Sequence, residues 1–280
     1  MENGTTVIGT EQIDLRLTLL ESAQCFHWVE KDGRFGAVLN GKGVWLWQRD
    51  GAVCAGGTAD VAALRRYLDL DRDYSRLVRE YASYEEARRA VEAFPGLRVL
   101  RQPMWETVVS FILSANNNVG RIRKLVEALR VRCGEKLETE YGDLYGFPSP
   151  EVLRRADPGE LRALGVGYRD RYLAETAALF ADGLIPENTD NLTYEETHAL
   201  LTRLPGVGDK VADCVQLFGC GQTEAFPVDV WVARLCRAVF RREESDRKKL
   251  GREMRKLLGQ DAGLLQQFLF HAARTGYLNL

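Results

Sequence analysis

The chain lacks the cysteine pattern of a metal site or a disulfide framework. Its six cysteines, at positions 25, 54, 133, 214, 220 and 236, include no CxxC pair. Zinc sites and disulfide-stapled domains carry paired or regularly spaced cysteines. We therefore expect neither a zinc knuckle nor disulfides, and no cofactor.

Long apolar runs are also missing. No stretch approaches the roughly 20 residues that a membrane-spanning helix needs. The N-terminal sequence MENGTTVIGTEQIDL lacks the charged and apolar regions of a signal peptide. These absences predict a cytoplasmic protein with no membrane partner.

A charge excess of either sign is absent as well, because 38 lysines and arginines face 40 acidic residues. Any nucleic-acid binding would therefore depend on a local basic face and not on net charge. With 45% hydrophobic and 28% charged residues, the 280-residue chain is typical of a soluble protein with two or three small subdomains.

Residues 193 to 218 carry the pattern of two helices joined by a tight glycine turn. Thr193 followed three positions later by Glu196 predicts a helix start, because each side chain can satisfy a backbone amide near the other. The sequence PGVG then ends that helix, and a second helix is expected from about Asp209. The pattern is a helix-hairpin-helix.

The glycine turn offers a seat for a phosphate group. We expect the amides of Gly206, Val207 and Gly208 to point outward at the start of a helix, where the helix dipole favours a negative group. A loosely held cation is the only metal expected there. A plain packing turn is the alternative, because glycine turns between helices are common.

Two ionisable residues follow the turn. Lys210 lies one residue beyond it among apolar positions, and a lysine amine is a nucleophile only when neutral. Asp229 precedes a periodic apolar run, so it can cap a helix while offering its charge to a site. Taken without any family, a solvated helix lysine and an ordinary cap are the simpler interpretations.

The strings LPGVGDKVADCVQLFG and AFPVDVWVARL together resemble the helix-hairpin-helix DNA glycosylases, and most closely the 8-oxoguanine DNA glycosylase/AP lyases. In that family the lysine after the hairpin attacks the sugar and the aspartate of the PVD run assists. The resemblance assigns these roles to Lys210 and Asp229. It spans about residues 22 to 274, and nothing after Cys236 could ligate the iron-sulfur cluster of other glycosylase branches.

The resemblance also implies a base pocket. Gln266 matches the glutamine that reads the Watson-Crick edge, and Phe270 the phenylalanine that stacks on the flipped purine. Cys214 matches the cysteine on the purine's other face. Ala23 stands where the family usually has a glycine, at the carbonyl that accepts from the N7 hydrogen of oxidised guanine. From spacing alone, Phe270 is equally a core residue.

The resemblance also implies that two further segments contact the DNA strand opposite the damaged base. The string SANNNVGRI resembles the family segment that holds the unpaired cytosine, which places that role on Asn116 and Arg121. Tyr168 and Arg169 match the pair that fills the hole and reads cytosine. The local alternatives are a polar turn and a helix start with a packed tyrosine.

We expect an α+β fold in two domains. Residues 1–98 should form a small antiparallel β-sheet domain, with residues 59–94 as covering helices. Residues 99–280 should form a mostly α-helical, two-lobed helix-hairpin-helix glycosylase domain, with the hairpin at about 194–218. The dipeptides Asp32-Gly33, Asn40-Gly41 and Asp50-Gly51 between alternating apolar runs predict the hairpins of the sheet.

The resemblance implies a bifunctional base-excision repair enzyme. It would flip 8-oxoguanine out of duplex DNA, excise it, and cleave the strand by β-elimination through a Schiff base on Lys210. Its partner would be double-stranded DNA containing oxidised guanine, bound by a monomer that is nucleoid-associated if bacterial. The alternatives are an alkylpurine glycosylase of the same fold, which uses a water, and a noncatalytic helix-hairpin-helix DNA-binding protein.

Overall fold

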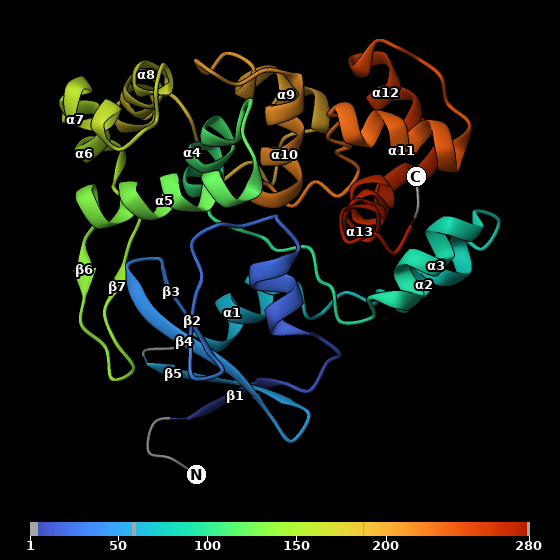
Figure 1. The fold of residues 1–280 in the computed structure, drawn as a ribbon, viewed down its shortest axis with the longest axis horizontal. Helices are drawn as coiled ribbons and strands as arrows, with labels where there is room; N and C mark the ends of the chain where they lie inside the picture. The colour runs from blue at the N-terminus through green and yellow to red at the C-terminus, as the bar shows by residue number, and fades with distance from the viewer. Residues whose placement is uncertain (1–4, 58–59, 187, 279–280) are drawn as a thin grey trace.

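The computed structural model describes residues 5–57, 60–186 and 188–278. A five-stranded antiparallel sheet of order β1-β5-β4-β3-β2 forms its N-terminal part (Figure 1). The strands are β1 Thr6–Gly9, β2 Val29–Lys31, β3 Arg34–Leu39, β4 Lys42–Arg49 and β5 Ala52–Gly57. The three predicted hairpin turns are confirmed, and each has positive φ at both central residues, as at Asp32 (50°) and Gly33 (73°).

The helices between the sheet and residue 94 divide between two cores. Helix α1 (Val61–Tyr67) packs on the sheet through Leu64 and Tyr67. Helices α2 (Ser75–Glu80) and α3 (Glu85–Ala93) instead join the core of the C-terminal helix α13 (Ala262–Arg274). The prediction that all of residues 59–94 covers the sheet is therefore wrong beyond α1, because α3 packs on α13 and α2 packs on α3 within the helical core.

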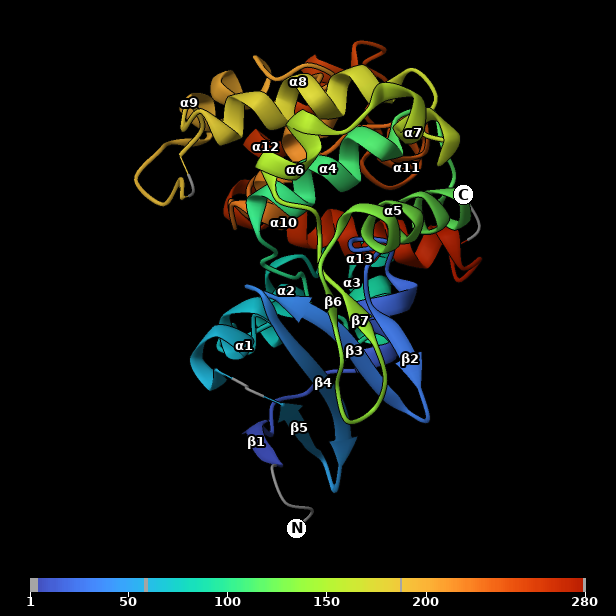
Figure 2. The same ribbon diagram turned by 90° about the vertical axis from the view of Figure 1, so that its left-hand side faces the viewer.

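The remaining chain is mostly helical and forms two lobes above the sheet (Figures 1 and 2). Helices α6 to α8 lie on one side and α11 to α13 on the other, with α4 and α10 between them (Figure 1). Helix α5 runs beneath α6 to α8 and α4, on the side of the sheet. Their bounds are α4 Met104–Ser114, α5 Val119–Cys133, α6 Pro150–Arg155, α7 Pro158–Ala163, α8 Arg169–Ala181, α9 Tyr194–Leu201, α10 Asp209–Gly219, α11 Val230–Phe240 and α12 Arg247–Leu258. Short turns of other helix types occupy Leu17–Glu21 and Gly259–Asp261.

A small hairpin from the helical part reaches back over the sheet. Its strands are β6 (Lys136–Leu137) and β7 (Leu144–Tyr145), and Figure 2 shows it extending down from α5 across β3 and β4. Leu144 packs with Trp45 and Trp47 on the sheet face opposite α1. The hairpin therefore ties the helical lobes to the sheet. In the described part of the chain, no helix combines the length and apolar character needed to cross a bilayer.

Candidate active site and DNA interface

The helix-hairpin-helix forms as predicted. Thr193 and Glu196 build the reciprocal cap that starts α9, with the Thr193 amide donating to Glu196 Oε2 over 2.8 Å. Gly206 has a φ of 82°, and a Cβ added there would lie 2.8 Å from the ring of Tyr172. Both the backbone conformation and the close approach of α8 therefore require glycine at this position.

The three amides of the turn are not equivalent. The Val207 amide donates to the Leu204 carbonyl over 3.0 Å, and the Val207 side chain is buried. The expectation that this amide points outward is wrong, because it closes the turn. The amides of Gly206 and Gly208 donate to no acceptor in the described part of the chain, so they are the available phosphate donors.

Helix α10 carries Lys210 to a half-buried position above an aromatic ring. Its Nζ lies 5.2 Å from the ring centroid of Phe111, which stacks on Phe218 at 5.6 Å. Asp229 caps α11 by accepting from the Val232 amide over 2.8 Å, and it too is half-buried. Phe111 was not among the predicted site residues, because its apolar spacing in α4 indicates only a core residue.

The charges of Lys210 and Asp229 both act on the thiol of Cys214. Its thiol is buried, and burial raises its pKa to about 11. The positive charge of Lys210 opposes this rise in pKa, whereas the negative charge of Asp229 adds to it. The structure therefore brings Lys210, Cys214 and Asp229 into one electrostatic neighbourhood.

Helix α13 presents Gln266 and Phe270 one turn apart. Gln266 is 4% exposed, yet its Oε1 has no hydrogen-bond partner among the described residues. A buried polar atom without a partner is costly, which is typical of an atom kept for a ligand. Ala23 is tied to the same helix, because the carbonyl of its neighbour Ser22 accepts from Gln267 Nε2 over 2.8 Å. Ala23 itself has a φ of 59°.

The residues expected to meet the opposite strand lie at two neighbouring tips. Asn116 is exposed between α4 and α5, with a φ of 48°. Arg121 is also exposed, and its Nη2 lies 3.5 Å from the Gly165 carbonyl oxygen. Tyr168 starts α8 and is 55% exposed. These side chains can reach a partner molecule without rearrangement.

Arg169 is buried, although its expected role is to read the cytosine of the bound DNA. Its side chain is 6% exposed and donates to the carbonyls of Val166 and Ala115. Its guanidinium carbon also lies 4.5 Å from the ring centroid of Tyr168. The structure therefore uses Arg169 to hold the two tips together and does not present it to solvent, so cytosine reading would require it to release a carbonyl.

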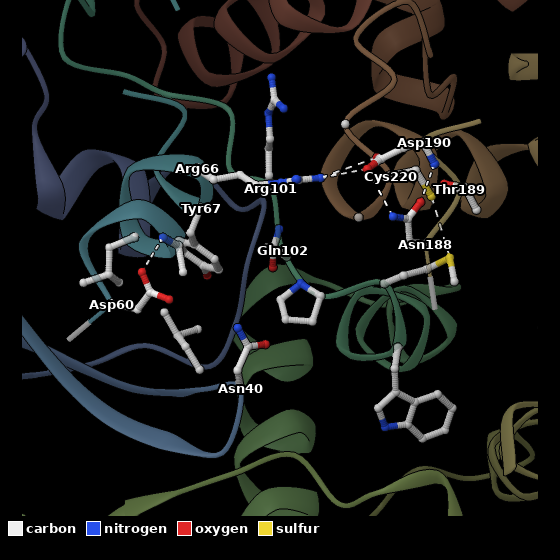
Figure 3. A pocket seen from close by; sticks show the side chains of 18 of the residues that line it. Asn40, Asp60, Arg66, Tyr67, Arg101, Gln102, Asn188, Thr189, Asp190 and Cys220 are labelled. Atoms are coloured by element: carbon white, nitrogen blue, oxygen red, sulfur yellow. Dashed lines mark hydrogen bonds and ion pairs between the residues drawn. The ribbon is translucent and has the colours of Figure 1, made fainter. Parts of the chain in front are cut away.

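Two cavities differ in their relation to these residues. One of about 730 Å³ lies between α1, the β3–β4 turn and α4, and contains the ion pair of Arg66 with Asp190 at 3.3 Å (Figure 3). None of the expected site residues lines it. A second cavity of about 510 Å³ is lined by Gly208 and Lys210 beside the hairpin. Cavity size therefore does not identify the active site here.

Comparison with known proteins agrees with this geometry. Residues 109–260 match the HhH-GPD superfamily of base excision DNA repair proteins, and residues 6–108 match the N-terminal domain of 8-oxoguanine DNA glycosylase. A probable N-glycosylase/DNA lyase of Methanothermobacter thermautotrophicus is 33% identical over 76% of this chain and 73% of its own length.

Two solved structures superpose on nearly the whole chain. The 8-oxoguanine glycosylase/lyase of Clostridium acetobutylicum, solved with double-stranded DNA containing cytosine opposite 8-oxoG, gives a TM-score of 0.88 at 29% identity and covers 96% of this chain and 94% of its own. MBOgg1, solved with a low-affinity DNA ligand, gives 0.91 at 29% identity over 99% and 98%.

These matches define a helix-hairpin-helix base excision repair protein, and within that superfamily the chain belongs to the 8-oxoguanine DNA glycosylases. The expected α+β fold, the family and the enzyme class, an N-glycosylase with DNA lyase activity, are confirmed.

Proposed function

We propose that this enzyme flips 8-oxoguanine out of duplex DNA, excises it, and cleaves the strand through a Schiff base on Lys210. The main observation in favour of this mechanism is that Lys210, just past the hairpin, and Asp229 both lie close enough to Cys214 for their charges to act on its thiol. The DNA in the Clostridium acetobutylicum complex supports the same substrate.

The chemical steps follow from the two charged groups. The neutral amine of Lys210 bonds to C1′ of the deoxyribose while the bond from C1′ to the base breaks, and the base leaves with that electron pair and takes up a proton. Asp229 stabilises the positive charge that develops on the sugar. Opening of the sugar gives the imine, loss of a C2′ proton follows, and its electrons expel the 3′ phosphate.

The base pocket supplies recognition. Flipping costs a few kcal/mol, which the pocket must offset. Stacking on an aromatic ring contributes about 1–3 kcal/mol per base, and we assign this contact to Phe270. We propose that the unpartnered Oε1 of Gln266 accepts from the base edge. The main chain at Ala23 and the side chain of Cys214 complete the pocket.

The remaining site residues would contact the opposite DNA strand and the DNA backbone. We propose that Asn116 and Arg121 hold the unpaired cytosine and that Tyr168 fills the vacated space. The exposed positions of these side chains support this role. The Gly206 and Gly208 amides would bind the backbone phosphate. We propose further that residues 1–98 and 99–280 are two domains of a monomer, with α2 and α3 of the first domain packed in the core of the second. The proposed location is the cytoplasm, with nucleoid association if the protein is bacterial.

Borohydride trapping tests the mechanism. With a duplex carrying 8-oxoguanine opposite cytosine, we expect a covalent adduct with the wild-type protein and none with undamaged duplex. Lys210→Gln should still bind damaged DNA but lose both excision and strand cleavage, because both need the same amine. Lys31→Gln, an exposed lysine on strand β2, is the matched control and should trap normally.

The alternatives give different outcomes. Excision by Lys210→Gln at the wild-type rate would refute the lysine mechanism. Release of a methylated purine without trapping would indicate the water-using alkylpurine glycosylase. Equal affinity for damaged and normal duplex, with no turnover, would indicate a noncatalytic DNA-binding protein.

A further inference from the structure

The 510 Å³ cavity beside the hairpin has a strongly basic wall. Helix α9 contributes Glu195 and His198, and the start of α10 contributes Gly208, Asp209 and Lys210. The opposite wall is made by four cations of helix α12, which we name the α12 cations: Arg247, Lys248, Arg252 and Arg255.

The periodicity of α12 explains why these side chains share one side. Positions 248, 252 and 255 are separated by four and three residues, so they lie along one stripe of the helix. Leu250 and Met254 lie on a different face and are fully buried. Packing of the apolar face therefore fixes the cations toward the cavity.

The α12 cations differ in their partners. Lys248 Nζ lies 2.9 Å from Asp209 Oδ1, and Arg255 Nη1 donates to the Tyr194 hydroxyl over 2.7 Å. Arg247 and Arg252 form no hydrogen bond or ion pair with a described residue. The carboxylate of Asp246, which experiences the charge of Arg252, is engaged by the Lys248 and Lys249 amides as the cap of α12. Neither guanidinium group is therefore held in an ion pair by a carboxylate of the described residues.

Three acidic residues, Glu195 among them, line the cavity against five lysines and arginines, so the acids do not cancel this charge. Asp209 is already shared between Lys248 and His198, whose Nε2 lies 3.4 Å away. Asp213 is buried against the Tyr194 hydroxyl, and burial raises the pKa of its carboxyl to about 7. The wall facing the hairpin is therefore net positive although the whole chain carries a formal charge of −2.

We propose that Arg247 and Arg252 form, with the start of α10, a second backbone-phosphate site that holds a DNA phosphate beyond the one at the hairpin. This inference rests on the proposed function, because it takes the same duplex as its ligand. The expected ligand is a backbone phosphodiester, since the site offers two fork-shaped guanidinium donors beside the positive start of α10 but no reader of base edges. Lys248 neutralises Asp209, whose carboxylate would otherwise repel a phosphate at this helix start.

The salt dependence of DNA binding tests the site. The probe is a short duplex carrying a tetrahydrofuran abasic analogue, which cannot form a Schiff base. Arg247→Gln/Arg252→Gln should bind more weakly. Its slope of log K against log salt should be shallower by about 0.9, since the loss of one phosphate contact removes about 0.9. Lys31→Gln/Arg49→Gln, which changes net charge equally at strand ends of the sheet, should keep the wild-type slope.

A second pair of variants isolates the role of Lys248. Lys248→Met should weaken binding, and adding Asp209→Asn should restore much of the affinity, because the uncompensated carboxylate is then removed. Equal slopes for the wild type and the Arg247/Arg252 double variant would overturn the phosphate site, whatever the trapping result. Wild-type protein that binds this duplex but gives no borohydride adduct with 8-oxoguanine would refute the proposed function and leave the comparison of slopes intact.

Discussion

Among single residues, Ala23 has the least expected conformation. Its φ of 59° lies in the left-handed region, where a residue with a Cβ is less stable by about 1–2 kcal/mol. Replacement by glycine removes that strain but adds about 0.5–1 kcal/mol of unfolded-chain entropy. We therefore expect Ala23→Gly to raise the free energy of unfolding by up to about 1 kcal/mol, measured by urea denaturation.

Ala63→Gly provides the comparison for this prediction. Ala63 lies inside α1 with ordinary helical geometry, so glycine there should lower the free energy of unfolding by about 1 kcal/mol. An equal loss at position 23 would show that the wild-type backbone carries no strain there. The family's glycine at this position would then need a functional explanation.

Residue roles could be predicted from the sequence only where the motif fixed the backbone. Lys210 and Cys214 share a helix, so their proximity followed from spacing. The resemblance assigned the reading of cytosine to Arg169, but its guanidinium is buried and donates to two backbone carbonyls. The burial of Arg169 depends on the position of the segment between α4 and α5 in the fold, and local sequence patterns do not predict that position.

At the scale of elements, the hairpin depends on Gly206. Gly206→Ala places a Cβ 2.8 Å from the Tyr172 ring at a φ of 82°. We expect a loss of at least about 1–2 kcal/mol in the free energy of unfolding from the backbone alone, and weaker binding to duplex DNA because the turn must shift. Equilibrium denaturation and binding to the abasic-analogue duplex measure the two effects.

Gly208 is the matched control for Gly206. Its φ is −95° and no atom lies within 4 Å of a Cβ built there. Gly208→Ala loses only the preference of a helix cap for glycine, under about 1 kcal/mol. Adding Tyr172→Ala to Gly206→Ala should relieve the clash; if Gly206→Ala is as stable as Gly208→Ala, the close approach of α8 does not constrain the turn.

The sequence predicted those elements that carry their own local signals. The Asp-Gly and Asn-Gly turns and the Thr193 cap each specify a conformation within four residues. Strands β1 and β6–β7 were missed because they are two to four residues long and exist through pairing with distant segments. The packing of α2 and α3 in the core of α13 was missed for a related reason. The apolar face of a helix shows that the helix is buried on that side, but it does not identify the core against which it packs.

For the whole molecule, a buried polar cluster joins the sheet to the helical lobes. Arg130 of α5 donates to the His27 carbonyl over 2.7 Å, and the Tyr67 hydroxyl lies 3.3 Å from His27 Nε2. Burial lowers the pKa of His27 to about 3. Glu106 of α4 belongs to the same cluster, since its charge acts on both Arg130 and Tyr67.

The carboxyl of Glu106 makes this junction sensitive to pH. Glu106 is half-buried as a residue, and its Oε2 is buried and has no partner in the described part of the chain. Burial raises its pKa to about 8, although the charge of Arg130 opposes the rise. The folded state therefore keeps a proton that the unfolded state releases near pH 4.5, so stability present at low pH is lost as pH rises from about 4.5 to about 8.

Glu106→Gln removes the ionisable group while keeping the shape of the side chain. At pH 5 its free energy of unfolding should be close to that of the wild type, and at pH 8.5 it should be higher by about 2 kcal/mol or more, since each unit of pKa difference corresponds to about 1.4 kcal/mol. Titration of His27 lowers stability only as pH falls below 6.5 and cancels in the difference between the two proteins. Glu127→Gln, which removes the exposed carboxylate 3.1 Å from Arg130, should show no such gain. Parallel stability curves for wild type and Glu106→Gln between pH 5 and pH 9 would mean that the Glu106 carboxylate is solvated at the junction.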